Sequence, residues 1–248
     1  MERRAVRTVY GINPVLEALK AASAIDRILL AEGRTGKAAL DIIRHARQRN
    51  IEVARMPEEE IRRLAGTDRH QGVAALIHEE FKYYDIEDLI SFWKESKEQA
   101  FFLILDSIQD PQNLGSLIRT ANAAGLHGVI IPKDRASEVT PTVVKASAGA
   151  TEHTRIAREV NLVRAIEKLK EEGVWTVAVE AGCRDTVYTA DLDRDLCVVI
   201  GSEGKGIRRL VRESCDFCVS IPMRGQVNSL NAAQAGAVAI FEALRQRL

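Results

Sequence analysis

The alternation of apolar runs with helix-like segments after Phe101 constrains the fold of this chain more than any other feature. The first run, FFLILDSI at 101–108, is apolar almost throughout, which is typical of a strand buried on both faces of a sheet. Comparable runs lie at 126–132, 174–182, 196–204 and 217–222, and helix-like segments lie at 113–125, 140–150, 161–173, 207–215 and 232–244. Strands that alternate with helices indicate a mostly parallel sheet with helices on both faces. We therefore predict an α/β fold for this part of the chain.

The first third of the chain shows the same patterns on a smaller scale. Asn13 is placed to cap a helix over 13–22, and Pro14 suits its first turn. Further helices are expected at 36–50 and 57–66, and strands at 25–33, 51–56 and 72–78. These residues are enough for a small α/β domain. Residues 79–99 are acidic and aromatic, and we interpret them as a linker with a helix over 86–93. The expected domains are thus 1–78 and 100–248, joined by 79–99.

Charge is balanced overall but unevenly placed. Residues 1–72 hold 14 basic and 10 acidic residues, and residues 73–100 hold 3 and 7. The mildly basic N-terminal third fits a nucleic-acid contact surface, although an ordinary solvated surface has the same balance. No apolar run approaches the roughly 20 residues of a membrane helix. The N-terminal MERRAVRTVYG lacks the apolar stretch of a secretory signal, so we expect a cytoplasmic protein.

Four cysteines are present, at positions 183, 197, 215 and 218. The pair Cys215-x-x-Cys218 is compatible with a zinc or redox motif, but no second pair or neighbouring histidine follows it. We therefore expect Cys215 and Cys218 to be two ordinary reduced cysteines, with no bound metal.

Three polar loops follow predicted strands, where ligands bind in open α/β sheets. These loops are DSIQDPQNLGSLIR at 106–119, GSEGKGI at 201–207 and IPMRGQVNSLN at 221–231. They meet only if their strands are neighbours. The second loop matches neither the phosphate loop G-x-x-x-x-G-K-[ST] nor the dinucleotide pattern G-x-G-x-x-G. It is either a plain glycine turn or a place where a ligand approaches the backbone.

Two polar features of the predicted helices need an explanation. Arg119 lies on an otherwise small and apolar helix, so it needs an anionic partner. That partner is either a carboxylate such as Glu203 or Asp106, or the phosphate of a substrate. The start of the last helix carries Asn228 and Asn231 on either side of Ser229, although capping explains only one of the three.

Together, in this order, the three loops resemble the three motifs of the SpoU/TrmH-type RNA ribose 2′-O-methyltransferases of the SPOUT superfamily. The motifs correspond to 113–125, 200–207 and 221–233. YGINPVLEAL and DRHQGVAA in the first third are similar to the small RNA substrate-binding domain fused to many members. The layout looks most like the branch that methylates a guanosine of bacterial 23S ribosomal RNA. A transfer RNA ribose methyltransferase and a non-catalytic RNA-binding module are the alternatives.

The resemblance implies a deep trefoil knot in domain 100–248, which would bind S-adenosylmethionine and form a homodimer. It implies RNA as substrate, with neither DNA nor a membrane as partner. It implies catalytic roles for Asn113, Arg119, Glu203, Ser229 and Asn231. It implies cofactor contacts at Val179, Gly182, Gly201, Ile221, Ser229 and Leu230. It implies RNA contacts at Arg119, Lys205, Arg224 and Asn228.

Overall fold

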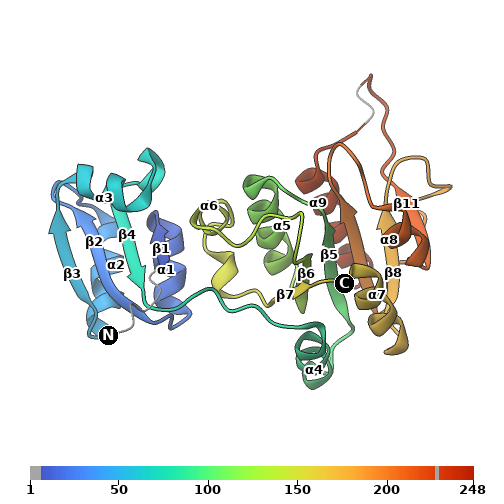
Figure 1. Ribbon diagram of the computed structural model, residues 1–248, viewed down its shortest axis with the longest axis horizontal. Coiled ribbons are helices and arrows are strands. Elements are labelled where there is room, and N and C mark those ends of the chain that lie inside the picture. The colour runs from blue at the N-terminus through green and yellow to red at the C-terminus, as the bar shows by residue number, and fades with distance from the viewer. Residues whose placement is uncertain (1–6, 227–228) are drawn as a thin grey trace. The chain divides into compact units, whose positions relative to one another are not determined.

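Two helix-covered sheets organise the residues described by the computed structural model, which are 7–226 and 229–248 (Figure 1). The chain forms two compact units. The N-terminal unit runs to Lys82 and also includes Val139–His153. The C-terminal unit consists of Tyr83–Glu138 and Thr154–Leu248.

The N-terminal unit is a mixed sheet with the strand order β1-β4-β2-β3. Strand β2 is parallel to β3, and β4 is antiparallel to both of its neighbours. Its core contains Ile28 and Ile42, which are fully buried. The elements are β1 (Arg7–Tyr10), α1 (Ile12–Lys20), β2 (Ile25–Ala31), α2 (Lys37–Gln48), β3 (Glu52–Met56), α3 (Glu58–Ala65), the 3-10 turn η1 (Asp68–His70), β4 (Val73–Ile77), α6 (Pro141–Ala146) and the 3-10 turn η2 (Ala150–Glu152).

Helix α6 joins the N-terminal unit although it lies far along the chain. Val144 is part of the same core as Val9 and Val15. Arg7 forms an ion pair of 2.8 Å with Glu152, at the end of the same segment. The expected domain 100–248 includes this segment, and the structure differs here because long-range packing leaves no local mark on the sequence.

The C-terminal unit is built on a sheet with the strand order β7-β6-β5-β10-β8-β11-β9, and every strand pair in it is parallel. This confirms the predicted α/β fold with a mostly parallel sheet. The elements are α4 (Ile86–Ser96), β5 (Phe101–Asp106), α5 (Pro111–Ala123), β6 (Gly128–Pro132), β7 (Ile156–Glu159), α7 (Leu162–Glu171), β8 (Trp175–Val179), β9 (Asp185–Thr186), β10 (Leu196–Gly201), α8 (Arg209–Ser214), β11 (Phe217–Ser220) and α9 (Ala232–Gln246). The trefoil knot stays a prediction.

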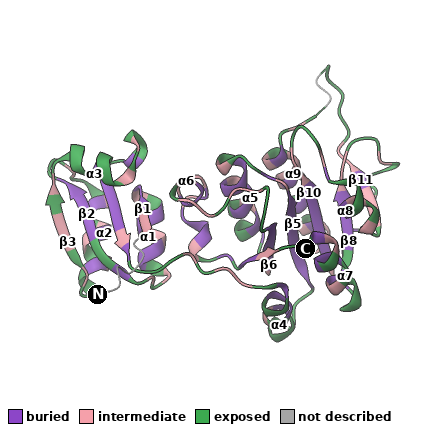
Figure 2. Cartoon of the chain, viewed as in Figure 1, coloured by how far each residue is buried: buried purple, intermediate pink, exposed green. Residues whose placement is uncertain are grey.

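Helices cover both faces of this sheet, whose central strands are buried throughout (Figure 2). Phe102 and Ile104 of β5 belong to one core with the buried residues of α4, α7 and α8. Side chains alternate along a strand, so Leu103 and Leu105 face the other side. There α5 and α9 pack against each other, and α9 also contacts β10.

Helix α4 is part of this core, although we expected the segment around it to be a linker. Asp85 caps the helix by accepting a hydrogen bond of 2.9 Å from the Asp88 backbone N–H. Leu89 and Trp93 lie in the same core as Phe102. The sequence predicted a helix over 86–93, but it did not show that the apolar side chains of this helix belong to the core of the C-terminal unit.

The sequence patterns did not reveal β1, β7 and β9. All three are sheet-edge strands of two to four residues. Short strands at a sheet edge bury few side chains, so their sequences show little alternation of apolar and polar residues.

The expectation that Cys215 and Cys218 are both ordinary reduced cysteines is wrong for Cys218. Cys183 and Cys218 form a disulfide with a Cα–Cα distance of 5.8 Å, whereas Cys197 and Cys215 are free and buried. Strand β11 lies beside β8, so the loop after β8 brings Cys183 next to Cys218. The spacing in the sequence groups Cys218 with Cys215, whereas its disulfide partner is Cys183. The order of the strands in the sheet decides which cysteine lies next to Cys218.

The described helices include none that is both long and apolar enough to cross a lipid bilayer.

We expect iodoacetamide at pH 8 to modify no cysteine in the folded, air-oxidised protein. Once the disulfide is reduced, we expect it to modify Cys183 and Cys218. Burial raises the pKa of Cys215 to about 12 and raises that of Cys197 as well. Roughly one Cys215 thiol in 10⁴ is then ionised at pH 8. Peptide mass spectrometry before and after dithiothreitol gives the answer, and modification of Cys218 without reduction would contradict the disulfide.

Candidate functional site

The three polar loops converge because the strands before them are neighbours. Strand β10 pairs with β5 on one side and with β8 on the other, and β8 pairs with β11. All four are parallel, so their carboxyl ends lie at one edge of the sheet. The loops 107–110 and 202–208, the described parts 221–226 and 229–231 of the loop after β11, and the loop after β8 therefore lie close together.

A hydrogen bond joins the first two loops. Asn113 donates from Nδ2 to Glu203 Oε1 at 2.7 Å. Asn113 is held in place because Asp110 caps α5, accepting from the backbone N–H groups of Gln112 and Asn113 at 3.2 Å each. Glu203 was one of the two carboxylates named as possible partners of Arg119, and the structure gives it Asn113 as partner.

Asp106, at the end of β5, holds the loop 202–208 in place. Its carboxylate is fully buried and accepts from the backbone N–H and the Nε of Arg208, both at 2.7 Å. Ser202 and Gly206 exchange two backbone hydrogen bonds, at 2.8 and 3.2 Å, which close the loop between them. The end of β5 thus sets where the loop after β10 lies.

Gly201 allows this loop to fold back on its strand. A Cβ atom at position 201 would lie 2.2 Å from the Gly206 backbone carbon and 2.3 Å from the Ile207 backbone nitrogen. Backbone atoms cannot move away as a flexible side chain can. Only glycine therefore permits the close approach.

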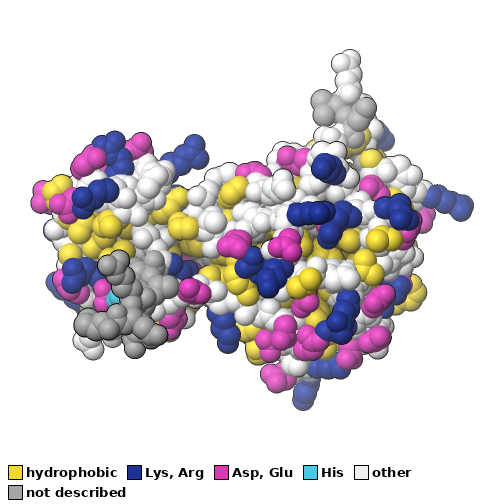
Figure 3. All heavy atoms as spheres, viewed as in Figure 1, with side chains coloured by type: hydrophobic (Ala, Val, Ile, Leu, Met, Phe, Trp, Pro, Cys, Tyr) yellow, Lys and Arg dark blue, Asp and Glu magenta, His cyan; other side chains and the backbone are white. Residues whose placement is uncertain are grey.

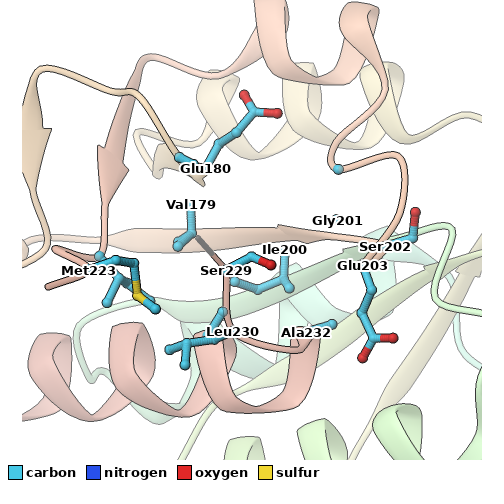
Figure 4. Close-up of a pocket in the computed structure, with 14 residues that line it drawn as sticks. Val179, Glu180, Ile200, Gly201, Ser202, Glu203, Met223, Ser229, Leu230 and Ala232 are labelled. Carbon is cyan, nitrogen blue, oxygen red and sulfur yellow. The ribbon is translucent and has the colours of Figure 1, made fainter. Parts of the chain in front are cut away.

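A first cavity of about 220 Å³ opens between the loops after β8, β10 and β11. Its walls are mainly apolar, with the carboxylates of Glu180 and Glu203 at its margins. Figure 4 shows Met223 at one end of the cavity and Ser202 and Glu203 at the other. It is lined by Val179, Glu180, Ala181, Ile200, Gly201, Ser202, Glu203, Gly206, Ile221, Met223, Ser229, Leu230, Ala232 and Ala235.

A second cavity of about 480 Å³ shares Ser202, Glu203, Gly206 and Ala232 with the first. It is more polar and lies over the loops after β5, β6 and β10. Its other lining residues are Ser107, Ile108, Gln109, Asp110, Asn113, Arg135, Gly204, Lys205 and Arg208.

The polar residues before α9 have different roles. Asn231 caps the helix, accepting from the Gln234 backbone N–H at 2.7 Å, while the Gln234 side chain accepts from the Asn231 backbone N–H. Ser229 instead lines the first cavity. Asn228 lies outside the described residues.

The other predicted site residues fall into two groups. Val179, Gly201, Ile221 and Leu230 line the first cavity, and Lys205 lines the second. Neither cavity includes Gly182, Arg119, Arg224 or Asn231 among its described lining residues. Arg119 is exposed on α5 and, within the described part of the chain, its side chain has no hydrogen bond or ion pair. Glu203 and Asp106, its two possible carboxylate partners, bind Asn113 and Arg208 instead.

Sequence reasoning missed several residues at the site. Glu180, Met223 and Arg135 line the cavities, and Asp106 appeared only as a possible partner of Arg119. Asp106 ends a continuous apolar strand, which was the one available signal for it. Arg135 had none, because its loop follows β6 and carries no motif.

Lysine and arginine are spread among acidic residues over the face in view rather than gathered in one patch (Figure 3). An anionic partner on this face would therefore be selected by local geometry, since no broad basic surface is seen there.

Two family models match the chain. Residues 100–241 match the SpoU rRNA Methylase family, and residues 8–83 match the model described as RNA 2′-O ribose methyltransferase substrate binding. A Bacillus subtilis (strain 168) protein, YacO, a candidate TrmH family tRNA/rRNA methyltransferase, is 43% identical over 96% of this chain and 95% of its own. A Staphylococcus aureus (strain MSSA476) candidate of the same family is 41% identical, with 96% of both chains covered.

Solved structures share the fold. The SpoU methyltransferase AviRb from Streptomyces viridochromogenes, in complex with AdoMet, is similar with a TM-score of 0.80 and 25% identity. The match covers 99% of this chain and 92% of AviRb. An AdoMet-bound rRNA methyltransferase from Sinorhizobium meliloti gives a TM-score of 0.79 and 25% identity, covering 100% of this chain and 89% of that one.

Gly201→Ala is expected to lower the free energy of unfolding by about 1–3 kcal/mol, because the added methyl group forces backbone apart. Gly204→Ala is the matched control, since a Cβ at Gly204 meets no atom within 4 Å. Urea unfolding of both variants measures the difference. Equal stabilities would contradict the close approach at Gly201.

The Asn113–Glu203 hydrogen bond is expected to appear as a coupling of about 1–2 kcal/mol in a double-mutant cycle. Asn113→Ala, Glu203→Ala and the double variant are compared by urea unfolding. If the two single effects simply add, the side chains do not interact in solution.

Proposed function

The chain belongs to the SpoU rRNA methylase family, and from this premise we propose that it methylates a ribose 2′-hydroxyl of 23S ribosomal RNA, at a guanosine. Family membership makes it an RNA methyltransferase. The particular RNA and the particular base belong to the proposal. The fused N-terminal match to an RNA 2′-O ribose methyltransferase substrate-binding model supports RNA as the substrate.

The observation that carries the proposal is the wall shared by the two cavities. Methyl transfer needs a donor pocket and an acceptor pocket that meet at the reacting atoms. Here an apolar cavity and a more polar one share Ser202, Glu203, Gly206 and Ala232. The Asn113–Glu203 pair lies at this boundary.

The first cavity fits S-adenosylmethionine. Val179, Ile200, Ile221 and Leu230 offer an apolar wall to a purine, and the close approach at Gly201 brings backbone groups to the cavity. Two carboxylates line this cavity and favour a cationic ligand, although Glu180 also pairs with Arg212 at 3.4 Å and Glu203 also accepts from Asn113. When bound, the cofactor would supply a methyl group attached to a sulfonium sulfur. After the transfer, the rest of the cofactor would be a neutral thioether. Gly182, outside the lining, would hold the turn after Glu180 and Ala181.

The residues around the shared wall would position the acceptor. Asn113, held by Asp110 and Glu203, would orient the ribose, and Ser229 would contact it from the first cavity. The new O–C bond forms as the C–S bond breaks, and the hydroxyl proton must leave. Asn231 would fix the start of α9 through its cap, and Asn228 and Arg224 would contact RNA from the same loop.

Arg119 is the proposed residue that holds the acceptor and assists removal of its proton. A guanidinium normally keeps its own proton, so an RNA phosphate would have to take part. Arg119 lies outside both cavities of its own chain, so this role requires a second copy. For this reason a homodimer through the C-terminal unit is part of the proposal.

The cytoplasm is the proposed location, because ribosomal RNA is made and assembled there in bacteria. The bacterial relatives support this, and we propose neither DNA nor a membrane as a partner.

Calorimetric titration with S-adenosylmethionine is expected to show binding to the wild-type protein and to Gly204→Ala, and at least tenfold weaker binding to Gly201→Ala. The reason is the displaced loop after β10, which lines the cavity. Wild-type protein that binds none would contradict the donor site.

Purified enzyme is expected to transfer methyl groups to unmethylated 23S ribosomal RNA, and Arg119→Ala is expected to lose at least 100-fold in kcat without losing stability. Ribose-methylation mapping identifies the nucleotide, and thermal unfolding is the control. Methylation of transfer RNA alone would replace the substrate, and full activity of Arg119→Ala would remove this residue from the mechanism.

A further inference from the structure

Arg135 lies at the second cavity, and neither a sequence motif nor a family match assigns it a role. It belongs to the loop 133–138 between β6 and α6, and it lines the cavity together with Lys205 and Arg208. Its backbone φ is +61°, in the left-handed region that non-glycine residues seldom adopt. Such a conformation persists only where neighbouring structure holds it.

The loop is anchored at both ends. The Lys133 backbone N–H donates to the Glu159 carbonyl at 2.8 Å, and Arg158 donates to the Lys133 carbonyl at 3.1 Å and pairs with Glu138. The Ser137 backbone N–H donates to the Ile108 carbonyl at 2.9 Å, which joins this loop to the loop after β5. These bonds hold the Arg135 backbone beside the cavity before any ligand binds.

The carboxylates at the cavity already have partners. Both oxygens of Asp110 accept backbone N–H groups at the start of α5, and Glu203 accepts from Asn113. The buried Asp106 accepts the Nε of Arg208, whose side chain is 45% exposed.

The cations are different. Within residues 7–226 and 229–248, neither Arg135 nor Lys205 has a hydrogen bond or an ion pair, and both are exposed. Two free cations at one cavity, with each nearby carboxylate engaged, match an anion that offers several acceptor oxygens.

We propose that Arg135 and Lys205 bind a phosphodiester of the substrate RNA, next to the nucleotide whose ribose is methylated. This inference rests on the proposed function, since the nucleotide is the acceptor at the shared wall. The second cavity is then both an acceptor pocket and a phosphate site, and the loop after β6 contributes to substrate binding. A phosphate held there fixes the register of the RNA backbone and leaves base selection to other contacts.

The test compares Arg135→Asn with Lys133→Asn in binding to unmethylated 23S ribosomal RNA over a range of salt concentrations. Asparagine removes the charge of Arg135 and tolerates the left-handed backbone. Lys133 is an exposed cation of the same loop outside the cavity lining, so it is the matched control.

Arg135→Asn is expected to weaken RNA binding roughly tenfold and to reduce the slope of log K against log salt by about 0.7. S-adenosylmethionine binding and thermal stability are expected to stay at wild-type values, and KM for RNA is expected to rise more than kcat falls. Lys205→Gln should give the same pattern, and Lys133→Asn should leave the slope unchanged.

If Arg135→Asn bound RNA with the affinity and the salt slope of the wild-type protein, the inference would be overturned. The proposed function would still stand if the wild-type enzyme methylated the RNA. An equal loss in Lys133→Asn would also overturn it, because it would show a general charge effect. If the wild-type protein bound no RNA and methylated none, the proposed function would fail first and the inference with it.

Discussion

The parallel pairing of β5 with β10 is the contact on which the rest of the site depends. Its register places Asp106 beside Gly201, so the loops after the two strands begin side by side. The buried Asp106 carboxylate can then bind Arg208, and Asn113 can reach Glu203. The Asp106 carboxylate is fully buried and accepts two hydrogen bonds from Arg208, whose side chain is 45% exposed. Both cavities take their shared wall from this strand pairing.

The same edge of the sheet explains why the site combines backbone and side-chain recognition. Glycine at position 201 brings the loop after β10 against its own strand, so the first cavity is bounded by backbone and apolar groups. The second cavity is bounded by the side chains of loops that are hydrogen-bonded to one another. An apolar ligand with a cationic centre suits the first cavity, and a polyanion suits the second. Their meeting at Glu203 is what makes transfer between two such ligands geometrically possible.

Covalent and long-range contacts complete the framework. The Cys183–Cys218 disulfide ties the loop after β8 to β11. Ala181, two residues before Cys183, and Ile221, three residues after Cys218, line the first cavity. The state of this bond therefore bears on the shape of the cavity. The segment with α6 packs into the N-terminal unit through Val144, so the chain leaves the C-terminal unit and returns to it.

Sequence alone determined the α/β class, the central strands and the three polar loops, because buried parallel strands and amphipathic helices leave strong local periodicities. It also placed Gly201, Ile221, Ser229 and Leu230 in loops that the structure brings to the first cavity. Tertiary structure decided the partners: Asn113 for Glu203, Arg208 for Asp106, Cys183 for Cys218 and the helix start for Asn231. It alone placed Arg135 at the second cavity and Arg119 outside both. Partners depend on strand order and register, which arise from contacts between residues distant in sequence, and a local pattern carries no record of them.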